Sequence, residues 1–214
     1  PPTMPPYIPV DDHPGPAYEP PADPWEDLSA EDQNDRRRQA VVDAFIHSWE
    51  GYVKYAWGKD ELQPATKNYR NWNEASKTGM GLTILDSLST MYLMNLTEQL
   101  DKALDWVRND LSFNIDVEGS AFESTIRGVG SLVSIYELTG EKDKKVLAKA
   151  VDLANRLLWA FNTSTGLPHS TVHFKTHRHF NQQWTGGGSI LSEFGTMQLE
   201  FRTLSYHTKN PVND

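Results

Sequence analysis

Apolar side chains recur every three or four positions in six separate segments of this chain, and this spacing restricts the fold more than any other feature. It is the period of an amphipathic helix, whose apolar residues share one face. The pattern predicts helices over about residues 35–56, 83–94, 96–111, 121–139, 146–161 and 190–207. Because alternating strand patterns are almost absent, the sequence predicts an all-α fold built of helical hairpins.

The helix predicted over residues 83–94 is apolar almost all round, so we expect it to be buried. Hairpins that include such a helix favour a toroid, in which an outer ring of helices covers an inner ring. Periodicity alone does not separate a toroid from a helical solenoid. Both architectures therefore stay open at this point.

Most of the 13 prolines lie within residues 1–28. Proline fixes φ and has no backbone N–H, so such a segment neither continues a helix nor forms a packed core. We therefore expect residues 1–34 to form an extended, Pro-rich tail or stem. Residues 35–214 are expected to form one helical domain.

The charge and the hydropathy of the chain exclude some functions. A formal charge of −9 at pH 7 argues against nucleic acid as a partner, because phosphate binding needs a basic face. No apolar run reaches the roughly 18 residues that span a bilayer, and the first residues lack the pattern of a secretory leader. We therefore expect membrane attachment only through an anchor upstream of this chain. The absence of cysteine excludes disulfides and thiolate metal sites.

Two tripeptides match the acceptor pattern for N-linked glycans in a secretory compartment. Such tripeptides also arise by chance, so glycosylation stays open. The two are Asn95-Leu96-Thr97 and Asn162-Thr163-Ser164.

A glutamate and an arginine stand four positions apart at the start of the fourth predicted helix, where an α-helix would place them on one face. Glu123 follows Ser120 with the spacing of a capping box, in which each side chain satisfies a backbone N–H of the other residue. Glu123 and Arg127 also have the spacing of a helix ion pair. The alternative is a working carboxylate beside a substrate clamp.

Further carboxylates and aromatic residues favour the second interpretation. Glu193 and Glu200 lie seven positions apart and are predicted on one face of the last helix. Carboxylates that face inward in a ring of helices suit glycosidic hydrolysis, in which one protonates the leaving oxygen and another activates water or attacks. The 7 Trp, 8 Tyr and 8 Phe could stack on sugar rings, although most lie at core positions of helices.

Four histidines form another cluster, with spacings that would suit a metal site on a helix. Their segment has no helical apolar pattern, however, so we expect a loop or a short extended excursion and no metal site. They are His169, His173, His177 and His179.

Four ordered blocks of the sequence resemble glycoside hydrolase family 47, the class I α-1,2-mannosidases that trim high-mannose N-glycans. With the helix lengths between them, the blocks cover roughly residues 35–210. They are "VVDAFIHSWEGYVKYAWGKDEL" (41–62), "GLTILDSLSTMYLM" (81–94), "FESTIR" (122–127) and "MQLEFRTLS" (197–205).

This resemblance implies an (αα)7 toroid, a bound calcium ion and inversion of anomeric configuration. It implies that Glu123 is the catalytic general acid, acting through a water. Arg127 would contact the substrate and influence which branch is trimmed, and Glu193 would line the sugar pocket. Asp86 and Glu200 are expected to be structural.

The chain supplies about three of the seven hairpins of such a toroid. The other catalytic carboxylates and the calcium-binding threonine are expected beyond Asp214, so we assign no metal ligand in this chain. Ser89 stands where many members have a second aspartate, which leaves the subgroup open.

We interpret the chain as the N-terminal half of an α-1,2-mannosidase that acts on high-mannose N-glycans of glycoproteins. It is expected in the lumen of the endoplasmic reticulum or Golgi, or secreted, and to be inactive alone. One alternative is a mannosidase-like glycan-binding protein of glycoprotein quality control without turnover. The other is a helical-repeat scaffold without a sugar site.

Overall fold

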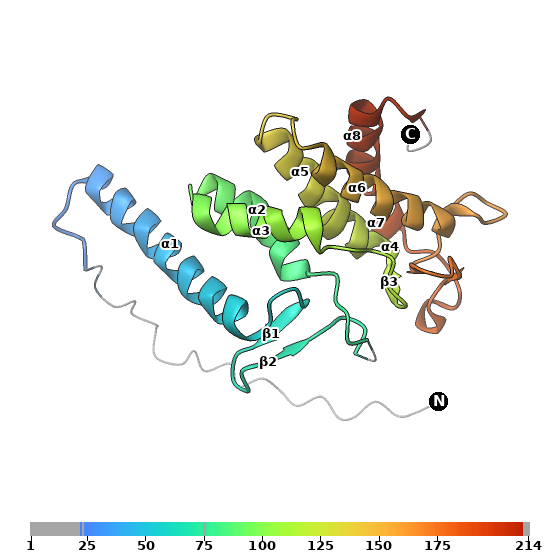
Figure 1. Ribbon diagram of the computed structural model, residues 1–214, viewed down its shortest axis with the longest axis horizontal. Coiled ribbons are helices and arrows are strands. Elements are labelled where there is room, and N and C mark those ends of the chain that lie inside the picture. The colour runs from blue at the N-terminus through green and yellow to red at the C-terminus, as the bar shows by residue number, and fades with distance from the viewer. Residues whose placement is uncertain (1–21, 23, 75, 212–214) are drawn as a thin grey trace, which may run out of the picture. The chain divides into compact units, whose positions relative to one another are not determined.

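The computed structural model describes residues 22, 24–74 and 76–211 (Figure 1). The chain divides into two compact units, residues 1–44 and 45–214. Helix α1 (Ala30–Tyr55) begins in the first unit, where Ser29 Oγ accepts a hydrogen bond of 3.1 Å from the N–H of Asp32. Because of this N-cap, the helix begins before Asp35, the residue at which the sequence pattern predicted its start. Of the rest of the predicted Pro-rich tail, residues 22 and 24–29 are described, and the others lie outside the described residues.

The second unit is mostly helical, as the sequence predicts. Its longer helices are α2 (Leu82–Leu93), α3 (Thr97–Asn109), α5 (Gly130–Leu138), α6 (Lys144–Leu157) and α8 (Gln198–Thr208). Shorter elements are α4 (Ala121–Glu123), the π-helix η1 (Ser124–Val129), the 3-10 helices η2 (Leu158–Phe161) and η3 (Gln183–Thr185), and α7 (Leu191–Phe194).

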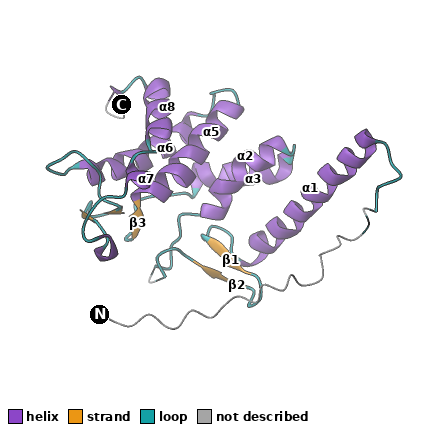
Figure 2. Ribbon diagram, turned by 180° about the vertical axis from the view of Figure 1, so that it is seen from behind, coloured by secondary structure: helices purple, strands orange, loops and turns teal. Residues whose placement is uncertain are grey.

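The core of this unit is built around α2, which packs against α3, α5 and η1 (Figure 2). Ile84, Leu85 and Leu88 are fully buried, so the prediction that this helix is buried is confirmed. Helix α6 packs against both α5 and η1 from its own apolar face. Among the described residues, no helix combines the length and the apolar character needed to cross a membrane.

Five short strands complete the described part of this unit. β1 (Glu61–Gln63) and β2 (Asn68–Arg70) form an antiparallel hairpin. β3 (Glu118–Ser120), β4 (Thr171–His173) and β5 (His179–Phe180) form an antiparallel sheet in that order. The extended excursion predicted near the histidines is confirmed by β4 and β5. The other strands have three residues each, too few to show an alternating pattern.

The last predicted helix is broken, and this corrects one expectation about the site. Helix α7 ends at Phe194, and α8 begins at Gln198. Between them, Thr196 Oγ1 lies 3.2 Å from the carbonyl oxygens of Ser192 and Glu193, which competes with the helical ladder. The prediction that Glu193 and Glu200 share one helical face is therefore wrong.

A buried aspartate joins the β1–β2 hairpin to the N-terminus of α2. Asp60 is 2% exposed. Its carboxylate accepts hydrogen bonds from the N–H groups of Met80 at 2.7 Å, Trp72 at 3.1 Å and Leu82 at 3.3 Å. Its carbonyl oxygen accepts the N–H of Thr83 at 3.2 Å. Asp60 therefore caps α2 from outside the helix and fixes the backbone of Trp72 beside it.

Candidate active site

The glutamate of the FESTIR block is held in place by a strand and a cap. Strand β3 pairs with β4 up to Ser120, and the N–H of Ala121 continues the ladder to the carbonyl oxygen of Ser170 at 2.9 Å. Ser120 Oγ accepts the N–H of Glu123 at 3.2 Å, so half of the predicted capping box is confirmed. In the described part of the chain, the Glu123 carboxylate accepts no hydrogen bond that would complete the box. The cap therefore orients Glu123 and leaves its carboxylate available.

The segment after Glu123 is a π-helix rather than an α-helix. A π-helix closes each hydrogen bond over five residues. Residue i+4 is therefore no longer aligned above residue i. As a result, Arg127 does not pair with Glu123, as their spacing allowed, but with Asp86 on α2.

Arg127 is held from two sides. Its Nε and Nη2 donate to Asp86 Oδ2 at 3.0 and 2.7 Å, and its guanidinium lies 4.4 Å from the ring centroid of Trp72. The Trp72 indole in turn donates its N–H to Glu61 Oε1 at 3.2 Å. This arrangement fixes the plane of the guanidinium and leaves its remaining N–H groups to bind a polar ligand. Asp86, which we expected to be structural, makes the bidentate contact.

The tertiary structure brings two glutamates together from distant parts of the sequence. Glu193 lies in the first turn of α7 and is half-buried. Burial raises the pKa of Glu193 above its usual value of 4.5, and the negative charge of Glu123 raises it further. The negative charge of Glu123 therefore favours the protonated form of Glu193 in this pair of carboxylates. Such a pair suits general acid chemistry.

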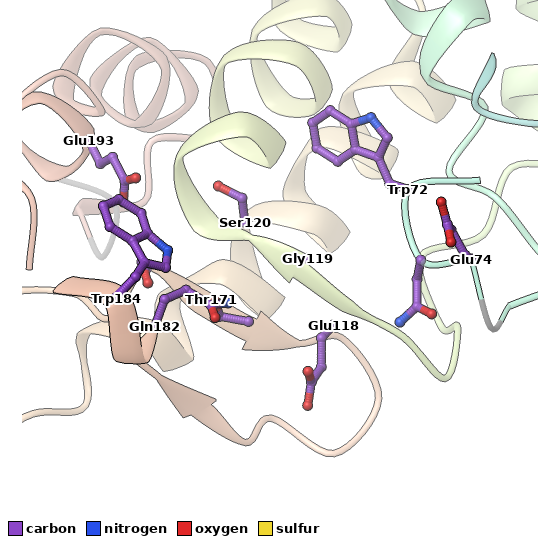
Figure 3. Close-up of a pocket in the computed structure, with 11 residues that line it drawn as sticks. Trp72, Glu74, Glu118, Gly119, Ser120, Thr171, Gln182, Trp184 and Glu193 are labelled. Carbon is purple, nitrogen blue, oxygen red and sulfur yellow. The ribbon is translucent and has the colours of Figure 1, made fainter. Parts of the chain in front are cut away.

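A pocket of about 440 Å³ adjoins these groups. Figure 3 shows Trp72 and Trp184 on opposite sides of Ser120, with Glu193 beside Trp184. Glu123 and Arg127 do not line the pocket themselves; Ser120, Glu193 and Trp72 connect them to it. The lining residues are Trp72, Asn73, Glu74, Glu118, Gly119, Ser120, Ser170, Thr171, Gln182, Trp184 and Glu193.

Sequence reasoning missed the two tryptophans of this pocket individually. Trp184 is 76% exposed, which is unusual for so large an apolar side chain. Its neighbours in the sequence are Gln and Thr followed by three glycines, with no helical apolar pattern. That context was the signal that Trp184 is not a core residue. The chain near it is tied down by Gln182, whose Nε2 donates to Thr171 Oγ1 at 2.9 Å.

Glu200 lies on α8, a different helix from that of Glu193. Its side chain packs over the glycine that begins α5, where an added Cβ would lie 3.4 Å from Glu200 Cγ. Its Oε2 atom is buried and has no hydrogen-bond partner in the described part of the chain. This packing is typical of a structural residue. The unpaired oxygen, however, has no donor among the described residues, which is unusual for a buried carboxylate.

The four histidines do not converge on one point. His169 and His179 lie 2.9 Å apart through their Nδ1 atoms, whereas His173 Nε2 lies 3.2 Å from an aspartate. His177 stacks on Trp159 with ring centroids 4.9 Å apart. Among the described residues, no group of three or more His, Asp or Glu side chains could hold a metal ion. Because calcium takes six to eight oxygen ligands, these residues do not fit a calcium site.

The chain is similar to known mannosidases both in sequence and in structure. The chain is 50% identical over 177 residues to mannosyl-oligosaccharide 1,2-alpha-mannosidase MNS1 of Arabidopsis thaliana, covering 82% of this chain and 30% of that protein. It is 47% identical over 177 residues to the endoplasmic reticulum mannosyl-oligosaccharide 1,2-alpha-mannosidase of Schizosaccharomyces pombe, covering 82% and 33%. An alpha-1,2-mannosidase structure from Trichoderma reesei matches 84% of this chain and 38% of that one, with 29% identity and a TM-score of 0.72.

The chain thus spans about a third of the length of these two curated relatives. Residues 44–212 match the family model described as glycosyl hydrolase family 47. This match extends over most of the chain and contains Glu123, Glu193, Arg127 and the residues that line the pocket. The chain therefore belongs to glycosyl hydrolase family 47.

Proposed function

We propose that this chain is the N-terminal part of the catalytic domain of a mannosyl-oligosaccharide α-1,2-mannosidase. The reaction would be hydrolysis of terminal α-1,2-linked mannose from high-mannose N-glycans, with inversion at the anomeric carbon. The observation that carries this proposal is the pairing of Glu123 with Glu193 beside a pocket that has a tryptophan on either side. A carboxyl that can act as acid and aromatic faces that can contact a sugar are part of what glycoside hydrolysis requires.

In this proposal Glu123 is the general acid. Its backbone is fixed by Ser120, and its carboxylate is used by neither the cap nor Arg127. It can therefore deliver a proton to the leaving glycosidic oxygen through a water. The neighbouring Glu193 has its pKa raised by burial and by the charge of Glu123, so this part of the site favours a protonated carboxyl.

Glu193, Arg127 and the two tryptophans would bind the sugar. Carboxylates accept hydrogen bonds from sugar hydroxyls, and the guanidinium of Arg127 donates to them in a plane set by Asp86. Trp72 and Trp184 offer flat faces to the apolar sides of pyranose rings. Selection among glycan branches would follow from how Arg127 and Trp72 orient the sugar outside the cleaved bond.

We assign the rest of the catalytic machinery to a region that corresponds to the C-terminal part of the relatives, which this chain does not match. An inverting site needs a second carboxyl roughly 6.5–9.5 Å from the acid to activate water. We propose that this base, a calcium ion with its threonine ligand, and the remaining hairpins of an (αα)7 toroid lie there. No step assigned to this chain involves calcium.

The proposed partners are glycoproteins that carry high-mannose glycans, in the lumen of the secretory pathway. Four relatives are named as endoplasmic reticulum enzymes, which supports that location. A non-catalytic glycan-binding protein remains the competing outcome of the test.

The test uses the 214-residue chain and a joined protein. In the joined protein, the chain is followed by the C-terminal part of the Arabidopsis relative, starting where the similarity to this chain ends. Release of mannose from mannosyl-α-1,2-mannose and binding of a high-mannose glycan are measured for both. We expect turnover only in the joined protein, and we expect Glu123→Gln to abolish turnover while glycan binding persists. Trp184→Ala, at an exposed position, should raise KM and leave the melting temperature unchanged.

Three outcomes would contradict the proposal in whole or in part. If Glu123→Gln retains full turnover in the joined protein, Glu123 is not the acid. If the folded joined protein binds the glycan without turnover, the glycan-binding function is favoured instead. Turnover by the 214-residue chain alone would show that the base lies within it.

A further inference from the structure

The turn between α2 and α3 contains one of the two glycan-acceptor tripeptides. Helix α2 ends at Leu93, and Asn95, two residues later, lies in the left-handed region at φ 57°. Its N–H donates to the carbonyl of Tyr92 at 3.1 Å, and the N–H of Leu96 donates to the carbonyl of Met91 at 2.9 Å. This is a Schellman motif, in which glycine or asparagine is preferred for its backbone conformation. The motif explains the backbone at Asn95 and makes no use of its side chain.

Thr97, the third residue of the tripeptide, is not explained by the fold. Helix α3 begins at Thr97, and its N-cap is Leu96, which makes no side-chain cap bond. A threonine one position earlier would cap the helix, whereas at the first helical position its hydroxyl does not. Within the described residues, neither the Asn95 amide nor the Thr97 hydroxyl takes part in a hydrogen bond. Both side chains are exposed.

The surface beside Asn95 is apolar. Tyr92 is 40% exposed and Leu93 is 75% exposed in the last turn of α2. A sugar attached to the asparagine amide would lie within reach of both side chains. The apolar face of its ring can pack on them and remove them from water.

We propose that Asn95 carries an N-linked glycan that covers Tyr92 and Leu93. The inference rests on the proposed function only in that it needs the chain to enter the secretory lumen. The donor is a lipid-linked oligosaccharide pyrophosphate. The Asn95 amide nitrogen forms a bond to the anomeric carbon of its first sugar, and that carbon's bond to the pyrophosphate oxygen breaks with its electrons on the oxygen. The amide loses one proton, and the lipid pyrophosphate leaves.

The test expresses the full chain behind a secretory leader in eukaryotic cells, with a C-terminal Asn-Ala-Thr tail that reports entry into the lumen. Asn162→Gln removes the other tripeptide, so Asn95 is the remaining native acceptor. Chains whose tail carries a glycan are digested with peptide-N-glycosidase and analysed by mass spectrometry, which detects conversion of a glycosylated asparagine to aspartate.

We expect conversion at Asn95 in this chain and in Thr97→Ser, which keeps the acceptor pattern. Thr97→Ala and Asn95→Gly should abolish it, and glycine preserves the Schellman turn, so loss in that variant does not reflect misfolding. An unmodified Asn95 in a chain with a glycosylated tail would overturn the proposal. That result leaves the mannosidase assignment standing, because Glu123, Glu193 and Arg127 lie on other elements. Loss of turnover in Glu123→Gln in turn says nothing about Asn95.

Discussion

Asp60 should contribute more to stability than any exposed carboxylate of the chain. Its carboxylate accepts three backbone N–H groups, two of them at 2.7 and 3.1 Å. Hydrogen bonds to a charged acceptor contribute about 2 kcal/mol each, and a buried donor left without an acceptor loses a similar amount relative to water. Removing the carboxylate with Asp60→Ala should therefore lower the free energy of unfolding by about 4 kcal/mol. This is a large share of the net stability of a typical domain, which is about 5–15 kcal/mol.

The assay is urea denaturation of the 214-residue chain followed by tryptophan fluorescence. Asp60→Asn keeps one acceptor oxygen and should cost about 2 kcal/mol, which gives a second point if the alanine variant is largely unfolded. Asp101→Ala, at an exposed position on α3, is the matched control and should change the free energy of unfolding by less than about 0.5 kcal/mol. A loss below about 1 kcal/mol in Asp60→Ala, with an unchanged denaturant slope, would refute the role of Asp60 as the cap of α2.

Three further predictions follow from the geometry. In Glu123→Gln, the pKa of Glu193 should fall but stay above its usual value, because the charge of Glu123 is removed and burial remains. Carbon-13 NMR titration of the Glu193 side chain measures this pKa. An unchanged pKa would show that the charge of Glu123 does not act on Glu193. A carboxyl whose pKa is raised on folding binds its proton more tightly in the folded state, so stability should fall as pH rises from about 4.5 through the raised value. Glu193→Gln should flatten that fall in urea titrations at several pH values, and an unchanged slope would contradict it. Gly81→Ala should cost about 3 kcal/mol or more, because φ is +68° and the new Cβ would lie 2.3 Å from the Trp106 ring. Gly187→Ala is the control: at φ +80° with open space around it, it should cost only about 1 kcal/mol of backbone strain. Equal losses of unfolding free energy for the two variants in urea denaturation would rule out the Trp106 clash.

Most of the helices could be predicted from the sequence, because a helix is specified by residues three and four apart and its buried face shows in that spacing. Helix α2 is an example: its pattern runs over residues 83–94, and the structure places it at Leu82–Leu93 in the core. The stop before Gly140 was equally local, since α5 ends at Leu138. The family was evident from ordered blocks, and the match over residues 44–212 confirms it. Glu123, Arg127 and Glu193 were proposed as site residues from their spacing and charge together with the resemblance to that family.

What the local pattern could not reveal depends on contacts between distant residues. The π-helix after Glu123 turns Arg127 toward Asp86 on another helix, and no spacing within the FESTIR block encodes that partner. The break after α7 moves Glu193 away from the helix of Glu200, and the same fold brings Glu193 within range of the Glu123 charge. Sequence by itself thus determined the helices and the chemistry available to them, because propensity and apolar period act locally. Only the tertiary structure decided which carboxylate meets which, because charge and packing act between residues that the chain brings together through space.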